Sequence, residues 1–234
     1  MSRWMTTILF LAGSAILTHW IPFSSFFRNL DTTVHEFGHA VATLLVSGQV
    51  MYIELFADHS GVTYSYVESG WRVIPVALAG YVTASLFALF LFYAYRAGNE
   101  RLGFAAMSLF AAASLLLFVR NGFGVVWLTG FIVVNIVAAM MPFRWLRHFY
   151  YLLVAFISLE ESVVGPIYLL VLSVTDSGQA GDAANLAQAT AIPSAVWAAA
   201  FVVFSLWCAR WSIGMFLKGR TDKRKKRVTE RPVA

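Results

Sequence analysis

Charged residues are scarce in this chain, and their scarcity sets the first limit on its structure. Only 12% of the 234 residues are charged, against about a quarter in typical soluble domains. Hydrophobic residues make up 59% of the chain, and the mean hydropathy is +0.71. Abundant aromatic side chains suit a lipid-facing surface with Trp and Tyr at its edges. The composition therefore argues against a soluble globular protein and suits one compact membrane domain.

Cysteine is also nearly absent. The single cysteine, Cys208, excludes an intramolecular disulfide. It lies inside an apolar run, where a cysteine usually acts as a small packing residue. We therefore expect Cys208 to have no chemical role.

Long apolar runs, by contrast, predict an α-helical integral membrane protein with about seven transmembrane helices. A spanning helix needs about 20 mostly apolar residues. The N-terminal run resembles a signal peptide but has no clear small-residue cleavage site, so we expect it to remain as the first helix. The predicted spans are residues 4–22, 73–95, 102–119, 122–140, 149–173 and 194–217, with a shorter and more polar seventh at about 30–47.

The region at about 48–70 has the pattern of a small β-hairpin. Residues 50–56 and 62–67 are strand-like, and the residues between them have turn composition. This hairpin follows directly after the seventh, more polar span. We expect residues 1–217 to form a single polytopic membrane domain that includes it.

Basic residues indicate how the chain is oriented. Residues 218–234 form a basic tail, which we expect to be disordered, cytoplasmic and close to anionic lipid rather than to nucleic acid. Alternate loops fall on two sides, with Arg28, Arg96, Arg101, Arg144 and Arg147 on the side of the tail and Arg3, Arg72 and Arg120 on the other. Seven spans would place the hairpin and the 174–192 loop outside the cytoplasm. These two segments lie on the same side of the membrane in any topology of this kind. If one predicted span were a re-entrant helix, both would lie on the cytoplasmic side.

The run at 34–40, VHEFGHA, contains the pattern H-E-x-x-H. Residues four apart share one face of a helix, so His35 and His39 can hold one zinc ion. Glu36 can then act as general base on zinc-bound water, whose pKa the metal lowers. The pattern is expected by chance in under roughly one chain in a hundred of this length. The alternatives are a structural histidine pair with a buried glutamate, and a site that binds metal without catalysis.

A catalytic zinc site of this kind needs a third protein ligand and one open position. The candidate carboxylates are Asp182, Asp176, Glu160 and Glu161. Glu160 and Glu161 lie midway along an apolar run, where they could be a ligand, a charge partner or part of a water-lined path. Asp182 could be a ligand or a helix N-cap. The residues alone leave Asp182 and the glutamate pair equal.

Several phrases together resemble the site-two protease group of intramembrane zinc metalloproteases, and more closely its compact bacterial branch. They are HEFGHA at 35–40, Ser47-Gly48, residues 60–63, Ala79-Gly80-Tyr81, Arg120-Asn121, and residues 182–193 followed by Trp197. The resemblance implies that His35 and His39 bind zinc, that Glu36 is the base, and that an aspartate completes the site, which favours Asp182. The Leu-Asp-Gly phrase of better-known members is missing. Those members also keep their site near the cytoplasmic face, unlike the orientation expected here.

The predicted function is zinc-dependent hydrolysis of peptide bonds in membrane protein or peptide substrates. The chain would be a multi-pass protein of the cell membrane, in a bacterial plasma membrane, with no nucleic-acid partner. The hairpin edge could pair with an extended substrate or simply cap the bundle. Two other functions stay open: a non-catalytic membrane adaptor with a structural metal site, and a small transporter that uses Glu160 and Glu161. Substrate identity and oligomeric state cannot be read from the sequence.

Overall fold

The computed structural model describes residues 3–20 and 24–219. Its helices are α1 Arg3–Trp20, α2 Ser24–Leu45, α3 Val73–Arg96, α4 Glu100–Ala113, α5 Gly122–Met140, α6 Arg144–Thr175, α7 Gly181–Thr190 and α8 Ser194–Leu217. The strands are β1 Gln49–Leu55 and β2 Gly61–Tyr66. A π-helical turn, η1 Ser114–Phe118, continues α4, and a 3₁₀ turn, η2 Ser177–Gln179, precedes α7. The predicted tail from residue 220 onward lies outside the described residues.

The predicted fold class, a helical membrane protein with a hairpin after the motif helix, is confirmed. Within the described residues, five helical stretches are long and apolar enough to cross a membrane: α3, α4 with η1, α5, α6 and α8. The predicted spans at 4–22 and 30–47 correspond in part to helices α1 and α2, which are not among these five. The chain is therefore a multi-pass membrane protein.

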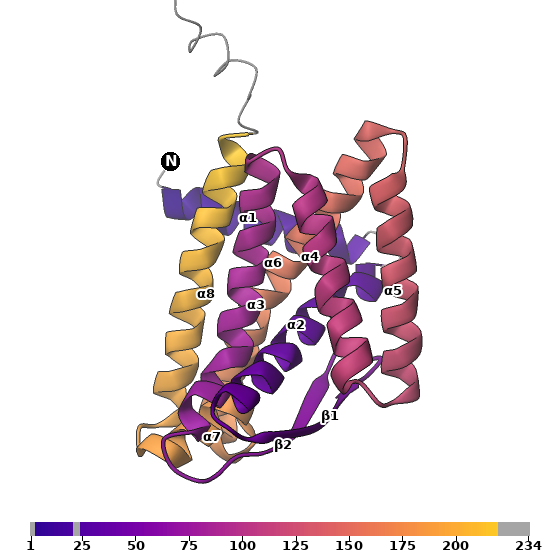
Figure 1. Ribbon diagram of the computed structural model, residues 1–234. Coiled ribbons are helices and arrows are strands. Elements are labelled where there is room, and N and C mark those ends of the chain that lie inside the picture. Colours follow the sequence, from indigo (N-terminus) through magenta and orange to yellow (C-terminus); the bar gives the residue numbers. More distant parts are fainter. Residues whose placement is uncertain (1–2, 21–23, 220–234) are drawn as a thin grey trace, which may run out of the picture.

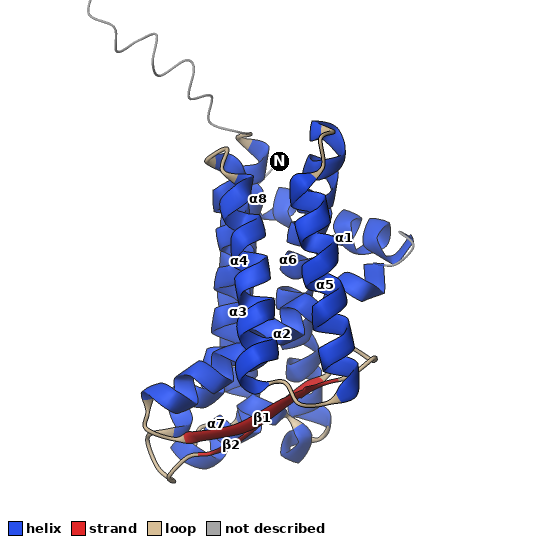
Figure 2. Cartoon of the chain, turned by 45° about the vertical axis from the view of Figure 1, so that its right-hand side comes forward, coloured by secondary structure: helices blue, strands red, loops and turns tan. Residues whose placement is uncertain are grey.

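The helices differ in direction. Figure 1 shows α3, α4, α5 and α8 upright, α6 crossing behind them, and α1 lying across the others. The helix α2 runs obliquely among them towards the hairpin. The hairpin and α7 lie together at one end of the bundle (Figure 2). This confirms that the hairpin and the 174–192 segment share a side.

Two groups of buried apolar side chains hold these elements together. The main core joins α2, the hairpin and the long helices, and includes Val34, Ile53, Leu91, Phe131 and Leu159. A smaller cluster fixes α7 against α3, α6 and α8, and includes Ala77, Leu169, Ala183, Leu186 and Phe201. The second cluster matters for the site because it fixes the short α7 beside the N-terminal part of α3.

Small residues let α2 and α3 approach closely. A Cβ atom added at Gly38 would lie 2.7 Å from Thr83 Oγ1 and 2.9 Å from the Ala79 carbonyl oxygen. Membrane helices commonly use glycine in this way, because lipid offers no hydrophobic drive for association and close backbone contact must supply it. The motif helix is thus held directly against α3.

The hairpin is fixed to the bundle along one edge. Strands β1 and β2 are antiparallel, with a bulge between Val50 and Tyr52. On the other edge of β1, Ile53 forms a bridge with Val119. The Asn121 side chain accepts a hydrogen bond from Leu55 N (3.2 Å) and donates one to Leu55 O (2.6 Å). Within the described residues, β2 is therefore the open edge of this two-stranded sheet.

Candidate metal centre

The H-E-x-x-H residues form one turn in the middle of α2. As their spacing requires, His35 and His39 lie on one face, and their Nε2 atoms are 2.9 Å apart. Their rings meet edge to face with centroids 4.6 Å apart. Two nitrogen atoms therefore converge on one point beside α2.

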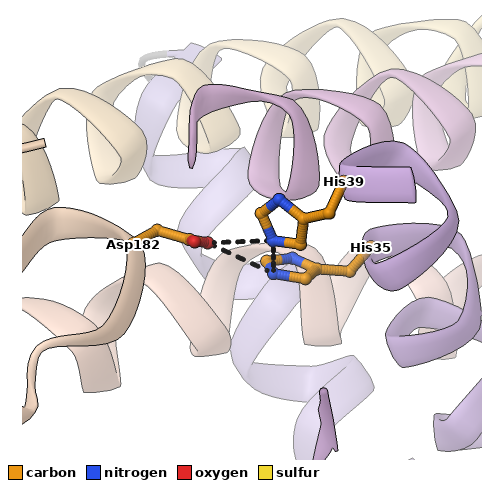
Figure 3. A group of neighbouring side chains, drawn as sticks. All are labelled: His35, His39 and Asp182. Atoms are coloured by element: carbon orange, nitrogen blue, oxygen red, sulfur yellow. Dashed lines mark hydrogen bonds and ion pairs between the residues drawn. The ribbon is translucent and has the colours of Figure 1, made fainter. Parts of the chain in front are cut away.

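Asp182 completes this group from the first turn of α7. Its Oδ2 atom lies 3.2 Å from His39 Nε2 and 3.4 Å from His35 Nε2 (Figure 3). It is not the N-cap of α7, a position that Ala180 occupies without a side-chain cap. We call His35, His39 and Asp182 the metal cluster, because their ligand atoms all lie within 4.8 Å of one another.

A hydrogen bond outside the cluster fixes the tautomer of His39. Its Nδ1 atom lies 2.8 Å from the Val76 carbonyl oxygen, which can only accept, so Nδ1 carries the proton. The lone pair of a neutral His39 ring is then on Nε2, which faces the cluster. This arrangement is the usual support for a metal-ligating histidine, and two imidazoles with one carboxylate form a known catalytic zinc donor set. The residues present therefore fit zinc.

Gly80 leaves the space that the two rings occupy. A Cβ atom at this position would lie 2.5 Å from both His35 Nε2 and His39 Nε2. The next residue, Tyr81, packs edge to face on His35, with ring centroids 4.5 Å apart. The backbone of α3 thus forms the wall behind the imidazoles.

Glu36 lies beside the metal cluster and is held from the hairpin. The Thr63 hydroxyl is 2.7 Å from Glu36 Oε2 and 3.0 Å from the Glu36 carbonyl oxygen. Gly61 permits this contact, since a Cβ atom there would lie 2.9 Å from Glu36 Cγ. Strand β2 thus fixes the carboxylate on the motif helix.

The cluster faces a cavity of about 500 Å³. Glu36, Thr63, Tyr81 and Asn185 line it together with the metal cluster. Burial opposes charge on Asp182, but the close contacts of its carboxylate with His39 and His35 outweigh burial and hold the pKa of Asp182 below its usual value. The site thus combines an ionised carboxylate, two imidazoles and a further carboxylate around one open space.

The other candidate ligands lie elsewhere. Glu160 and Glu161 on α6 meet Arg28 of α2, with Glu160 Oε1 3.5 Å and Glu161 Oε1 2.8 Å from the guanidinium nitrogens. We call these three residues the ion-pair cluster. Asp176 accepts a hydrogen bond from Gln179 at 2.7 Å, close to α7. Arg28 is therefore a partly buried residue of α2, and it is not the loop charge that the sequence suggested.

The sequence analysis assigned no role to two residues that position the site. Val76 offers only a backbone carbonyl, which leaves no trace in a residue pattern. Thr63 alternates normally within a predicted strand, and nothing in its type distinguishes it from a surface threonine. Both act through contacts between segments far apart in the chain.

Comparison with known proteins identifies the family of this chain. The searches of curated proteins and of solved structures gave no match. The family model described as Peptidase M50B-like, a site-two protease family, matches residues 5–212. That match covers most of the helices and every residue of the metal cluster, and the chain therefore belongs to the Peptidase M50B-like family.

Proposed function

We propose that this protein is an intramembrane zinc metalloprotease that hydrolyses peptide bonds of membrane-associated substrates. His35, His39 and Asp182 would hold the zinc ion, and Glu36 would be the catalytic base. The observation that carries the proposal is that Asp182 of α7 lies next to His35 and His39 of α2, although the two helices are far apart in the sequence. The buried Glu36 lies beside these three residues. The cell membrane, in a bacterium, is the proposed location.

The chain's own residues provide the proton chemistry. Zinc in such a site supplies a Lewis acid that polarises a carbonyl group and lowers the pKa of water. Glu36 would accept the proton of the attacking water and pass it to the leaving amine. Thr63 keeps the Glu36 carboxylate at the cavity, and Val76 keeps the ring of His39 turned with Nε2 towards the cluster.

The hairpin offers a way to hold the substrate. A helical substrate must unwind locally before its scissile bond is accessible, because helix hydrogen bonds enclose the backbone. Residues Gly61, Val62, Thr63 and Ser65 of β2 line the cavity, and β2 is the open edge of the sheet within the described residues. An extended substrate could add to this edge next to Glu36.

Zinc content tests the proposed site. The protein purified in detergent, without chelator, is expected to contain about one zinc per chain, as one three-ligand site requires. His35→Ala and Asp182→Ala are expected to lose it, whereas the double variant Glu160→Ala/Glu161→Ala is the matched control and should keep it. Loss of zinc in the control would move the third ligand to α6. A folded parent without zinc would contradict the protease function.

Two other functions predict different results. A membrane adaptor with a structural metal would keep its function in Glu36→Gln, because that change removes only the base. A transporter that uses Glu160 and Glu161 would be indifferent to His35→Ala. The pairing of both glutamates with Arg28 favours a structural role for them, so the transporter gains no support from the geometry.

A further inference from the structure

The bundle has two ends, and the metal cluster lies near one of them. We call this the hairpin end, because β1, β2 and α7 gather there (Figure 2). Helix α3 begins shortly after the hairpin and runs away from it, so the α3–α4 turn lies at the far end (Figure 1). Helix α4 returns to the hairpin through η1, since Val119 pairs with Ile53. The five spans therefore alternate strictly between the two ends.

Positive charges gather at the far end. The basic residues close to helix termini there are Arg96, Arg101, Arg144, Arg147 and Lys218. The sequence then continues with Arg220, Lys223, Arg224, Lys225, Lys226 and Arg227. Arg210, in the C-terminal half of α8, lies towards the same end.

Among the described residues, the hairpin end has no lysine and few arginines. Arg72 pairs with Glu68, and Arg120 donates hydrogen bonds to the carbonyl oxygens of Leu117 and Val119. The acidic residues of the hairpin and of the segment before α7 are Glu54, Asp58, Glu68 and Asp176. Arg28 lies close to His59 of the hairpin turn, so it counts with Arg72 and Arg120 on this side, and the basic residues of the far end still outnumber these three arginines.

Lysine and arginine in short segments flanking membrane spans set orientation, and acidic residues contribute little. The far end therefore belongs on the cytoplasmic side, where anionic lipid attracts it. We infer that the metal cluster opens on the extracytoplasmic side. The argument holds whether or not α1 and α2 cross the membrane, because each of the five spans has one terminus at each end.

This orientation defines the class of substrate, and that part rests on the proposed function. The cavity at the hairpin end would accept a bond at or near the extracytoplasmic end of a spanning segment. A membrane-anchored protein would then be cut on its outer side. Segments on the cytoplasmic side of the substrate would not reach Glu36.

Cysteine labelling tests the orientation without any need for activity. The only native cysteine, Cys208, is buried, so Cys208→Ala provides a silent background. Single cysteines are placed at three exposed positions: Ser69→Cys and Ser177→Cys at the hairpin end, and Asn99→Cys at the far end. Spheroplasts that express each variant are treated with a membrane-impermeant maleimide before and after permeabilisation.

The expected result is labelling of Ser69→Cys and Ser177→Cys in sealed spheroplasts, and of Asn99→Cys only after permeabilisation. The opposite pattern, or equal labelling of both ends in sealed spheroplasts, would overturn the inference. Zinc content measured on the same variants separates the two proposals. Reversed labelling in a protein that binds zinc contradicts the orientation alone, whereas the expected labelling without zinc contradicts the protease alone.

Discussion

The ion-pair cluster and the metal cluster of this apolar bundle differ in what neutralises their carboxylates. In the ion-pair cluster, the permanent charge of Arg28 meets Glu160 and Glu161. In the metal cluster, Asp182 meets two imidazoles, which carry positive charge only if protonated, and a cavity lies beside them. A buried carboxylate in a membrane protein is therefore not by itself a sign of a reactive site. The two clusters are distinguished by whether a permanently charged side chain already neutralises the carboxylates.

The largest expected effect is a loss of catalysis when the carboxylate beside the metal cluster is changed, and not when one in the ion-pair cluster is changed. Glu36→Gln removes the proposed base but keeps the shape of the side chain, so the rate of peptide hydrolysis should fall by about 10²- to 10⁴-fold. Zinc content should not change, since Glu36 is not a proposed ligand. Glu161→Gln is the matched control and should retain most of the activity. Full activity in Glu36→Gln, measured on a membrane-anchored reporter, would remove Glu36 from the mechanism.

The second prediction concerns stability and the ion-pair cluster. Arg28→Gln leaves Glu160 and Glu161 without their cation, and such a loss should lower the free energy of unfolding by about 3 kcal/mol. That value is the lower end of the range for buried pairs, because the Arg28 side chain is 24% exposed. Unfolding in a denaturing detergent titration measures the change, and zinc content should stay at the parent level.

The control for Arg28→Gln is Arg72→Gln, which breaks a more exposed ion pair with Glu68. Exposed pairs are worth roughly 0–1 kcal/mol, so this variant should unfold almost like the parent. Equal effects of the two variants would show that the ion-pair cluster is no more than a surface contact.

The third prediction concerns the metal cluster alone. Gly80→Ala puts a methyl group 2.5 Å from both histidine Nε2 atoms, so the rings must move away from α3. Affinity for zinc should fall by about 10- to 100-fold, as when residues that support metal ligands are changed. Gly214→Ala is the control, because a Cβ atom there meets nothing within 4 Å. Titration of the metal-free proteins with zinc compares the two, and unchanged affinity in Gly80→Ala would contradict the site.

The smallest expected effect concerns the link between the hairpin and the base. Thr63→Val removes the hydroxyl that donates to Glu36 Oε2 without changing the size of the side chain much. Loss of a hydrogen bond to a charged group should lower kcat/KM by about 10-fold, equivalent to about 1.4 kcal/mol. Thr129→Val is the control, since its hydroxyl bonds only within α5. A loss of activity with lost zinc would instead indicate a disrupted fold.

Much of the fold follows from local patterns. The apolar runs at 73–95, 122–140 and 194–217 match α3, α5 and α8 within a residue or so, because the thickness of a bilayer fixes the length of a spanning helix. The two strands also lie where alternation and turn composition predicted them. The run at 102–119 hid the change from α-helix to π-helical turn at Ser114, since apolar composition does not encode such a change.

The sequence was weaker where elements had to be placed in space. The runs at 4–22 and 30–47 form helices, yet α1 lies across the bundle (Figure 1) and α2 carries the polar motif. Hydropathy reports the length of an apolar run and says nothing of its direction. The short α7 was not separated from its loop, because its ten residues owe their position to packing against α3, α6 and α8.

The sequence by itself determined the membrane class, the hairpin and the turn of helix that carries His35, Glu36 and His39, because each depends on residues near one another in the chain. It left Asp182 equal to Glu160 and Glu161 as a partner for the histidines. Only the tertiary structure decided between them, because α7 packs against the start of α3 and both glutamates form ion pairs with Arg28. Contacts between residues more than a hundred positions apart depend on packing, which no local pattern records.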